Sequence, residues 1–538
     1  MKKIILTLEK KWFILPCLSA FFLIFSFYPF NIPFLSFVAL VPLFYFTFFL
    51  TNLSNWKLFG GGFLVGFLFS TSISFFSLMQ FHWLPEAHFF TSIVHSLFLP
   101  IASITGAISG LLILFIKKIK HSKFIYNIVV FASLWTLFEW LVFISFSGFH
   151  MGLLAYTVNN FPILMSFAGI GGIFLVSFII VIINIFITAF LFIITSQKTE
   201  NRTILQKEMI GSFLIFIIIM TSIYLINSSY LSDDNKQISS IRIAIIQDAE
   251  REESIFGEFK NEIFYFERLE EILKETSINN PDVIVYPFAP FDGVLSIDKN
   301  PGVVFNKNIL VGDKESFGQW LKGKIQPEVV FITWNSVFRD GEFYNEYNFW
   351  KNGELINYYQ KRGLFAFMDY TPQWSQKVGI FSTPFDVSPG EDNQTINLNG
   401  IVTGNLLCSE VSKQELARKD SLSGVDIFFA IGSEAMFKDS VAGQINIISA
   451  QFRAIENNHP IVRANKFGPS AIIDNHGKEL GRLEFNEKGI LVKDIKYTKE
   501  APKTLYTQTG NSPFIVLLTI FVLIGIFRKF KYRKLKTP

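Results

Sequence analysis

The sequence predicts a bundle of about eight membrane-spanning helices that carries a large extracytoplasmic α/β domain just before its last span. Half of the 538 residues are hydrophobic and 17% are charged, whereas soluble chains usually have about a quarter of charged residues. Long apolar runs fill the first 228 residues, and each is near the length of about 20 residues that crosses a bilayer. From residue 229 to 511 the pattern changes to alternating strand-like and helix-like segments.

The apolar runs define the expected membrane part. They lie at 12–29, 34–50, 58–80, 90–116, 125–147, 162–195 and 210–227, and one more lies at 512–527. The first run is longer than the apolar part of a signal peptide, and no small-residue cleavage site follows it, so we interpret it as a retained span. We expect residues 1–228 to form a transmembrane bundle of about seven spans, and residues 512–538 the last span with a basic tail.

The positive charges predict the orientation of these spans. Lysine and arginine gather in the N-terminal segment, in the second, fourth and sixth loops and in the C-terminal tail, whereas the first, third and fifth loops contain neither. Because basic loops stay on the cytoplasmic side, we expect both termini to be cytoplasmic and residues 229–511 to lie outside.

The outer segment reads as an α/β domain. Strand-like runs at 241–247, 283–288, 329–334 and 426–431 alternate with helix-like stretches, of which 256–276 and 441–457 are the clearest. Such alternation over about 280 residues is typical of an α/β fold.

Composition excludes several classes of function. The formal net charge of +4 does not indicate binding to nucleic acid. The two cysteines, Cys17 and Cys408, form no CxxC motif or Cys/His cluster, so the sequence predicts neither a metal site nor a disulfide framework. No diffusible cofactor is implied.

Cys408 is the first candidate for chemistry. It follows an apolar strand-like run and precedes polar residues, and nucleophiles often occupy such a strand-to-helix junction. An unpaired thiol outside the cytoplasm is unusual, and Cys17 lies within the first span. The alternative is a buried structural cysteine, which is common.

Charged residues supply further candidates. Lys361 lies among aromatic and apolar residues, where it could stabilise an oxyanion or a thiolate, although a solvated surface lysine is the simpler interpretation. Glu410 shares a strand face with Cys408 if the strand continues, and it could orient Lys361. Arg453 and Glu456 lie three residues apart on a predicted helix, so we expect a local ion pair there.

These segments, taken in order along almost the whole chain, resemble the apolipoprotein N-acyltransferase family. Its outer domain belongs to the carbon–nitrogen hydrolase (nitrilase) superfamily. The resemblance rests on Trp135-Thr-Leu-Phe-Glu139-Trp140, Tyr359-Gln-Lys361-Arg-Gly-Leu364, Leu407-Cys408-Ser-Glu410, Phe452-Arg-Ala-Ile-Glu456 and Thr507-Gln-Thr-Gly-Asn511. It implies a nitrilase-like αββα sandwich on a membrane bundle, in the inner membrane of a bacterium with the sandwich in the periplasm.

The resemblance also implies a reaction. Cys408 would attack a phospholipid ester to form a thioester, and the N-terminal amine of a diacylglyceryl-modified lipoprotein would then accept the acyl chain. Lys361 would stabilise the oxyanion and thiolate, and Glu410 and Asp369 would hold the lysine in place. The expected partners are therefore a phospholipid acyl donor, a lipoprotein acceptor and the membrane.

One position departs from the superfamily pattern. The Trp-Pro-Glu motif that supplies the general base reads Tyr286-Pro-Phe288 here, and phenylalanine cannot accept a proton. Loss of a positioned base costs about 10²–10⁴-fold in rate. Asp292 and Glu410 are the carboxylates that could substitute. Three functions therefore remain open: an active transferase with a modified triad, a catalytically impaired paralogue that binds lipid or lipoprotein, and a membrane-tethered amidase.

Overall fold

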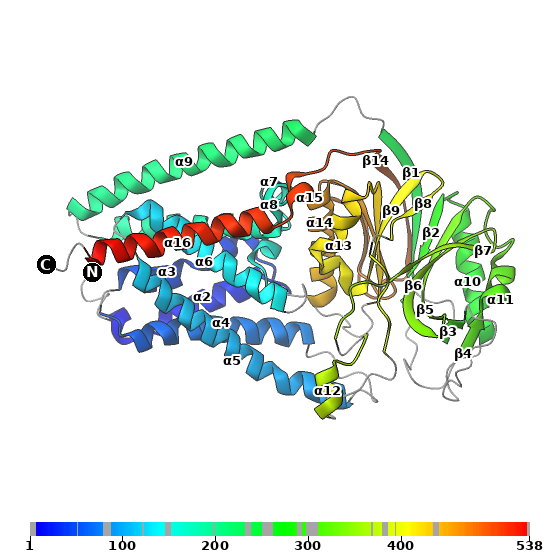
Figure 1. Ribbon diagram of the computed structural model, residues 1–538, viewed down its shortest axis with the longest axis horizontal. Helices are drawn as coiled ribbons and strands as arrows, with labels where there is room; N and C mark the ends of the chain where they lie inside the picture. The colour runs from blue at the N-terminus through cyan, green and yellow to red at the C-terminus, as the bar shows by residue number, and fades with distance from the viewer. Residues whose placement is uncertain are drawn as a thin grey trace.

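The computed structural model has two parts, a helical bundle and an α/β sandwich, which lie end to end along the longest axis of the molecule (Figure 1). It describes residues 7–50, 52–78, 88–120, 123–145, 152–196, 200–231, 238–249, 262–287, 293–296, 310–366, 369–378, 386–392, 394–433 and 441–534.

The predicted apolar runs are largely helical wherever the structure describes them. The longer helices of the bundle are α2 (Ile14–Ser26), α3 (Val41–Phe49), α4 (Asn55–Leu78), α5 (His88–Ile119), α6 (Phe124–Ser145), α8 (Ala168–Thr195), α9 (Glu200–Leu231) and α16 (Ser512–Lys534). Short helical segments, η1 (Pro33–Phe37), η4 (Leu154–Val158) and α7 (Pro162–Ser166), join them. Within the described residues, α4, α5, α6, α8 and α9 are long and apolar enough to cross a membrane, and the other apolar helices are shorter. Eight spans therefore stay a prediction.

Helix α9 shows why this bundle needs a lipid environment. It runs along one edge of the bundle, and its far end leads to the sandwich (Figure 1). Its apolar side chains are largely exposed, including Leu214, Ile218 and Ile226, which is 70% exposed. A continuous apolar surface of this kind is unfavourable in water and favourable against acyl chains. The chain is a membrane protein.

Two β-sheets form the centre of the sandwich. The first has the order β14-β1-β2-β5-β3-β4, with β6 paired to β5 and β7 paired to β6. The second has the order β13-β12-β11-β10-β9-β8. The strands of the first sheet are β1 (Ile238–Gln247), β2 (Val283–Tyr286), β3 (Gly293–Ser296), β4 (Leu310–Asp313), β5 (Val330–Arg339), β6 (Glu342–Lys351), β7 (Glu354–Gln360) and β14 (Gly489–Thr498). Those of the second are β8 (Ile396–Leu398), β9 (Ile401–Leu407), β10 (Ile427–Gly432), β11 (Ile461–Asn465), β12 (Ser470–Ile473) and β13 (Glu479–Leu483).

Helices cover the outer faces of both sheets. The helices α10 (Glu262–Ser277) and α11 (Lys314–Leu321) pack on the first sheet through a core that includes Leu273 and Phe331. The helices α13 (Gln414–Leu422) and α14 (Val441–Asn457) pack on the second. The inner faces of the two sheets share one apolar core. The predicted αββα sandwich is confirmed, because alternating apolar runs bury both faces of each sheet.

Helix α14 joins the sandwich to the bundle. Ile447 and Ala450 belong to the core against the second sheet, whereas Ile448 and Phe452 belong to the core of the helical bundle. Every residue of α14 except Gln444 is buried, so its polar side chains, Arg453 and Glu456 among them, are buried together with its apolar ones. The predicted helix at 441–457 is confirmed. Its position between the sandwich and the bundle was not predicted from the sequence.

Glu456, on the last turn of α14, fixes this joint. The predicted local pair is confirmed, since Arg453 Nε lies 2.7 Å from Glu456 Oε2. The other oxygen, Oε1, accepts hydrogen bonds of 3.0 Å from the backbone N–H of Ile173 in α8 and from Gln414 Nε2 in α13. Gly172 of α8 lets Asn511 pack closely against this helix. Its φ is +71°, and a Cβ there would lie 2.3 Å from Asn511 Oδ1.

The sandwich contains one histidine that makes its stability sensitive to acid. Burial lowers the pKa of His459 to about 4, although a hydrogen bond to the backbone of Asp426 acts the other way. The unfolded chain takes up this proton near pH 6.5 and the folded chain does not. The contribution of neutral His459 to the free energy of unfolding is therefore complete above about pH 6.5. It falls by up to about 3 kcal/mol as the pH drops to 4.

We expect His459→Gln to flatten this acid dependence, measured as the unfolding temperature of the full chain between pH 7 and 4. His476→Gln, at an exposed position, is the matched control and should keep the wild-type profile. An unchanged slope in His459→Gln would contradict the assignment.

Candidate active site

Cys408 lies directly after β9, at the strand end where the sequence predicted it. It begins the short helix η5 (Cys408–Ser412) and is partly exposed, with a φ of +56°. A positive φ is uncommon outside glycine, and such strained positions cluster at functional sites. Gly432, at the end of the neighbouring strand β10, makes room for this turn, because a Cβ there would lie 3.2 Å from Cys408 Cα.

Lys361 directly follows β7 and is only 4% exposed. Its Nζ lies 2.5 Å from Asp369 Oδ2. Burial acts to lower the pKa of Lys361, but a thiolate at Cys408 and the carboxylate of Asp369 outweigh burial and hold that pKa above its ordinary value. The lysine therefore stays protonated, and the structure brings it together with the Cys408 thiol.

Asp369 positions the lysine. Its Oδ1 accepts a hydrogen bond of 3.1 Å from Asn345 Nδ2, on strand β6, and its Oδ2 accepts one of 2.7 Å from the backbone N–H of Phe365. With the Lys361 contact, both oxygens are engaged. Asp369 is thus an anchor for the ammonium group.

Glu410 connects the segment after β7, which carries Lys361, to the turn that carries Cys408. It is fully buried. Its Oε1 accepts from the backbone N–H groups of Arg362 at 2.8 Å and Gly363 at 2.6 Å. Its Oε2 accepts from the backbone N–H of Leu407 and the hydroxyl of Tyr359, each at 2.7 Å. Four donors on one carboxylate argue against Glu410 as the substitute base.

Two further residues support this arrangement and were missed by sequence reasoning. Arg362 forms a bidentate ion pair with Asp420 of α13, with N···O distances of 2.8 and 2.9 Å. Tyr347 accepts a hydrogen bond of 2.7 Å from the backbone N–H of Ile431, and its hydroxyl donates to Leu406 O. Arg362 stands beside Lys361 in the sequence, but nothing local indicates that its partner lies 58 residues away.

The predicted base position lies outside the described residues, as does Asp292. Strand β2 ends at Tyr286, two residues before Phe288. The assignment of Phe288 to this position therefore stays a prediction. Within the described part of the chain, no group of three or more His, Cys, Asp or Glu side chains is arranged to hold a metal ion.

An αββα sandwich with a cysteine and a lysine at its strand ends, mounted on a bundle of apolar helices, defines a membrane-bound protein with a carbon–nitrogen hydrolase domain. Residues 324–503 match the carbon–nitrogen hydrolase family, and residues 19–186 match the apolipoprotein N-acyltransferase N-terminal domain. Both parts of the chain thus match family models, and the one for the helical bundle is that of the apolipoprotein N-acyltransferases.

Relatives align along most of the chain. Apolipoprotein N-acyltransferase 1 of Treponema denticola is 24% identical over 92% of this chain and 91% of its own length. Apolipoprotein N-acyltransferase of Borreliella burgdorferi is 26% identical over 92% and 90%. Among solved structures, an amidase from Nesterenkonia sp. aligns with 51% of this chain and 94% of its own, with 19% identity and a TM-score of 0.35.

Proposed function

We propose that this protein transfers a fatty acyl group from a membrane phospholipid to the N-terminal amine of diacylglyceryl-cysteine lipoproteins through a thioester on Cys408. The names of the relatives support the coarse activity, lipoprotein N-acylation. The observation that supports the thioester step is the buried, protonated Lys361 beside a strained Cys408.

In the first step the Cys408 sulfur attacks the sn-1 ester carbonyl. A C–S bond forms, the ester C–O bond breaks, and the thiol proton ends on the hydroxyl of the departing lysophospholipid. In the second step the lipoprotein amine attacks the thioester carbonyl, a C–N bond forms, the C–S bond breaks, and a proton returns to the sulfur. Lys361 stabilises the thiolate and the oxyanions of both steps.

The proposed orientation suits this reaction. The alternation of basic and non-basic loops supports cytoplasmic termini and a periplasmic sandwich in the bacterial inner membrane. Both substrates are then lipids of the outer leaflet. The attachment of α14 to the bundle core keeps the sandwich close to that leaflet.

Acylation of Cys408 is the direct test. We expect the purified full chain, incubated with phosphatidylethanolamine and no acceptor, to gain the mass of one fatty acid less one water, and hydroxylamine to remove this adduct. Intact-protein mass spectrometry measures the adduct. Cys408→Ala is expected to acquire none, whereas Cys17→Ala, which keeps Cys408, should be labelled like the wild type. A hydroxylamine-sensitive adduct in Cys408→Ala would contradict the proposed thioester on Cys408.

A second candidate is a paralogue that binds lipid or lipoprotein without acylating it. Phe288, at the position where the resemblance puts the base, favours this candidate. It predicts no adduct in the wild type and a gain of adduct when a carboxylate is restored.

A further inference from the structure

A cavity opens in the helical bundle at the end remote from the sandwich. Its volume is about 650 Å³, and it lies among the ends of α3, α5 and α8 and the starts of α6 and α9. This end of the bundle lies opposite the sandwich that holds Cys408 (Figure 1). Cavities of 300–1,000 Å³ are the usual size for a bound small molecule.

The charged side chains of the cavity are predominantly basic. Lys120, Lys123 and Arg202 line it together with one acidic residue, Glu208. Glu208 Oε2 accepts a hydrogen bond of 2.7 Å from the backbone N–H of Phe124. Its charge therefore lies at the N-terminus of α6, where the helix dipole favours an anion. The lining carries three positive charges against this one negative charge.

The remaining lining is largely apolar. Phe48, Phe131, Ile185 and Phe192 contribute to it, and Phe49 stacks on Phe192 with ring centroids 3.8 Å apart. The cavity thus joins a basic region at the helix ends to an apolar region inside the bundle. This polarity matches a molecule with an anionic head and a hydrocarbon tail.

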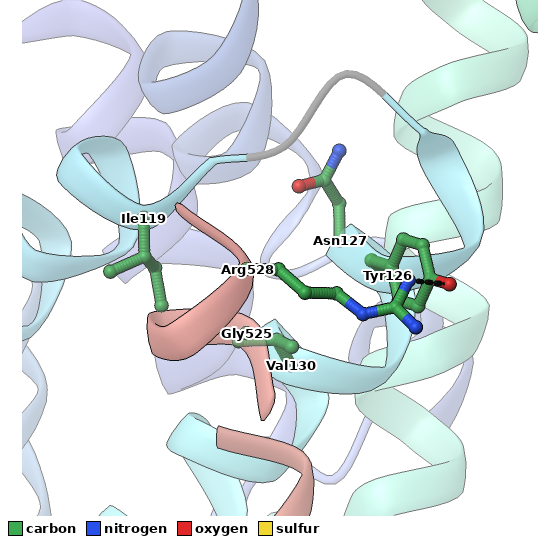
Figure 2. A pocket seen from close by; sticks show the side chains of 6 residues that line it. All are labelled: Ile119, Tyr126, Asn127, Val130, Gly525 and Arg528. Atoms are coloured by element: carbon green, nitrogen blue, oxygen red, sulfur yellow. Dashed lines mark hydrogen bonds between the residues drawn. The ribbon is translucent and has the colours of Figure 1, made fainter. Parts of the chain in front are cut away.

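A smaller pocket beside the cavity adds a further cation. Asn127 lines both, and Figure 2 shows Arg528 of α16 lying across the ring of Tyr126 in this pocket. The guanidinium carbon is 4.2 Å from the ring centroid. The basic region therefore extends to the last helix of the chain.

We propose that the cavity is a binding site for an anionic phospholipid, with its phosphate among Lys120, Lys123 and Arg202 and an acyl chain along the phenylalanines. Basic pockets between transmembrane helices on the cytoplasmic side recognise such headgroups, and the predicted orientation puts this end of the bundle in the cytoplasmic leaflet. The site is separate from Cys408 and does not depend on the proposed acyl transfer.

Native mass spectrometry of the full chain in detergent tests this proposal. All samples carry Cys408→Ala, so that acyl transfer does not consume the lipid. Phosphatidylglycerol, phosphatidylethanolamine and phosphatidylcholine with identical chains are added separately. We expect phosphatidylglycerol to be retained preferentially. Lys123→Gln with Arg202→Gln should weaken its binding about 30-fold, since each basic residue near an anionic lipid contributes about fivefold.

The matched control removes the same charge from exposed positions at the same end of the bundle, Lys10 and Lys207. Lys10→Gln with Lys207→Gln is expected to bind phosphatidylglycerol like the parent. An equal loss of phosphatidylglycerol binding in both double variants would show that only overall charge matters, and it would overturn the proposed site. Equal retention of phosphatidylglycerol, phosphatidylethanolamine and phosphatidylcholine would also overturn it. Competition by soluble glycerol phosphate at the same concentration would mean an anion site without a lipid and would also overturn it.

Discussion

Replacing Phe288 by glutamate is expected to raise the rate of Cys408 acylation by about 10²–10⁴-fold, which is the usual contribution of a positioned general base. A free thiol is only a few per cent thiolate near neutral pH. In the proposed mechanism Lys361 stabilises the thiolate but, because its pKa is raised, it does not accept the thiol proton. The resemblance implies that a carboxylate at position 288 would accept that proton.

The rate of adduct formation with phosphatidylethanolamine, followed by intact-protein mass spectrometry, measures this effect. Phe288→Gln is the control, because it has the shape of glutamate without the basic oxygen, and it should remain at the wild-type rate. If the wild type forms no detectable adduct and only Phe288→Glu does, the wild type is the impaired paralogue. Equal rates in the wild type and Phe288→Glu would mean that another group already supplies the base, and Asp292→Asn would test the nearest candidate in the sequence.

Asp369→Asn is expected to cause a large loss of Cys408 acylation. Lys361 is 4% exposed, and Asp369 is its ion-pair partner at 2.5 Å. Removing one partner of a buried pair costs about 3–5 kcal/mol, because the other charge is left uncompensated. The pKa of Lys361 should fall, so that part of the protein lacks the cation that stabilises the thiolate and oxyanion. Acylation should drop with it.

The pH profile separates this role from a general loss of stability. Because the pKa of Lys361 is raised in the folded protein, its ion pair stabilises fully below the unfolded pKa of about 10.4 and is lost as the pH rises through the folded value. In Asp369→Asn the alkaline fall in acylation should move to lower pH.

The matched control is Asp420→Asn, which removes the partner of the equally buried Arg362. Arginine does not deprotonate in proteins. This variant should therefore lose stability in thermal unfolding but keep the alkaline limit of acylation. A shift of that limit in Asp420→Asn, or its absence in Asp369→Asn, would contradict the positioning role.

Much of the secondary structure could be predicted because it depends on local pattern. The strands predicted at 241–247, 329–334 and 426–431 correspond to β1, β5 and β10, since continuous apolar runs indicate strands buried on both faces. The helix predicted at 441–457 has the same bounds in the structure. The helix predicted at 256–276 is described only from residue 262, where α10 begins, and its earlier part lies outside the described residues.

Only part of the candidate active site could be predicted from local sequence pattern. Cys408 and Lys361 stand out because a thiol and an ammonium group follow strand-like runs. The partners of these residues do not stand out. Glu410 receives donors from residues 47, 48 and 51 positions away, and no periodicity of the sequence carries such separations.

The sequence by itself determined the apolar helices, the alternating strands and helices, and the two reactive side chains, because length, hydrophobic period and chemical type are local properties. Only the tertiary structure decided that α14 joins the sandwich to the bundle and that Glu410 is a structural acceptor. It also decided that basic and aromatic residues of α3, α6, α8, α9 and the segment between α5 and α6 surround one cavity. Each of these depends on which elements pack together, and packing is selected by contacts between residues far apart in the chain.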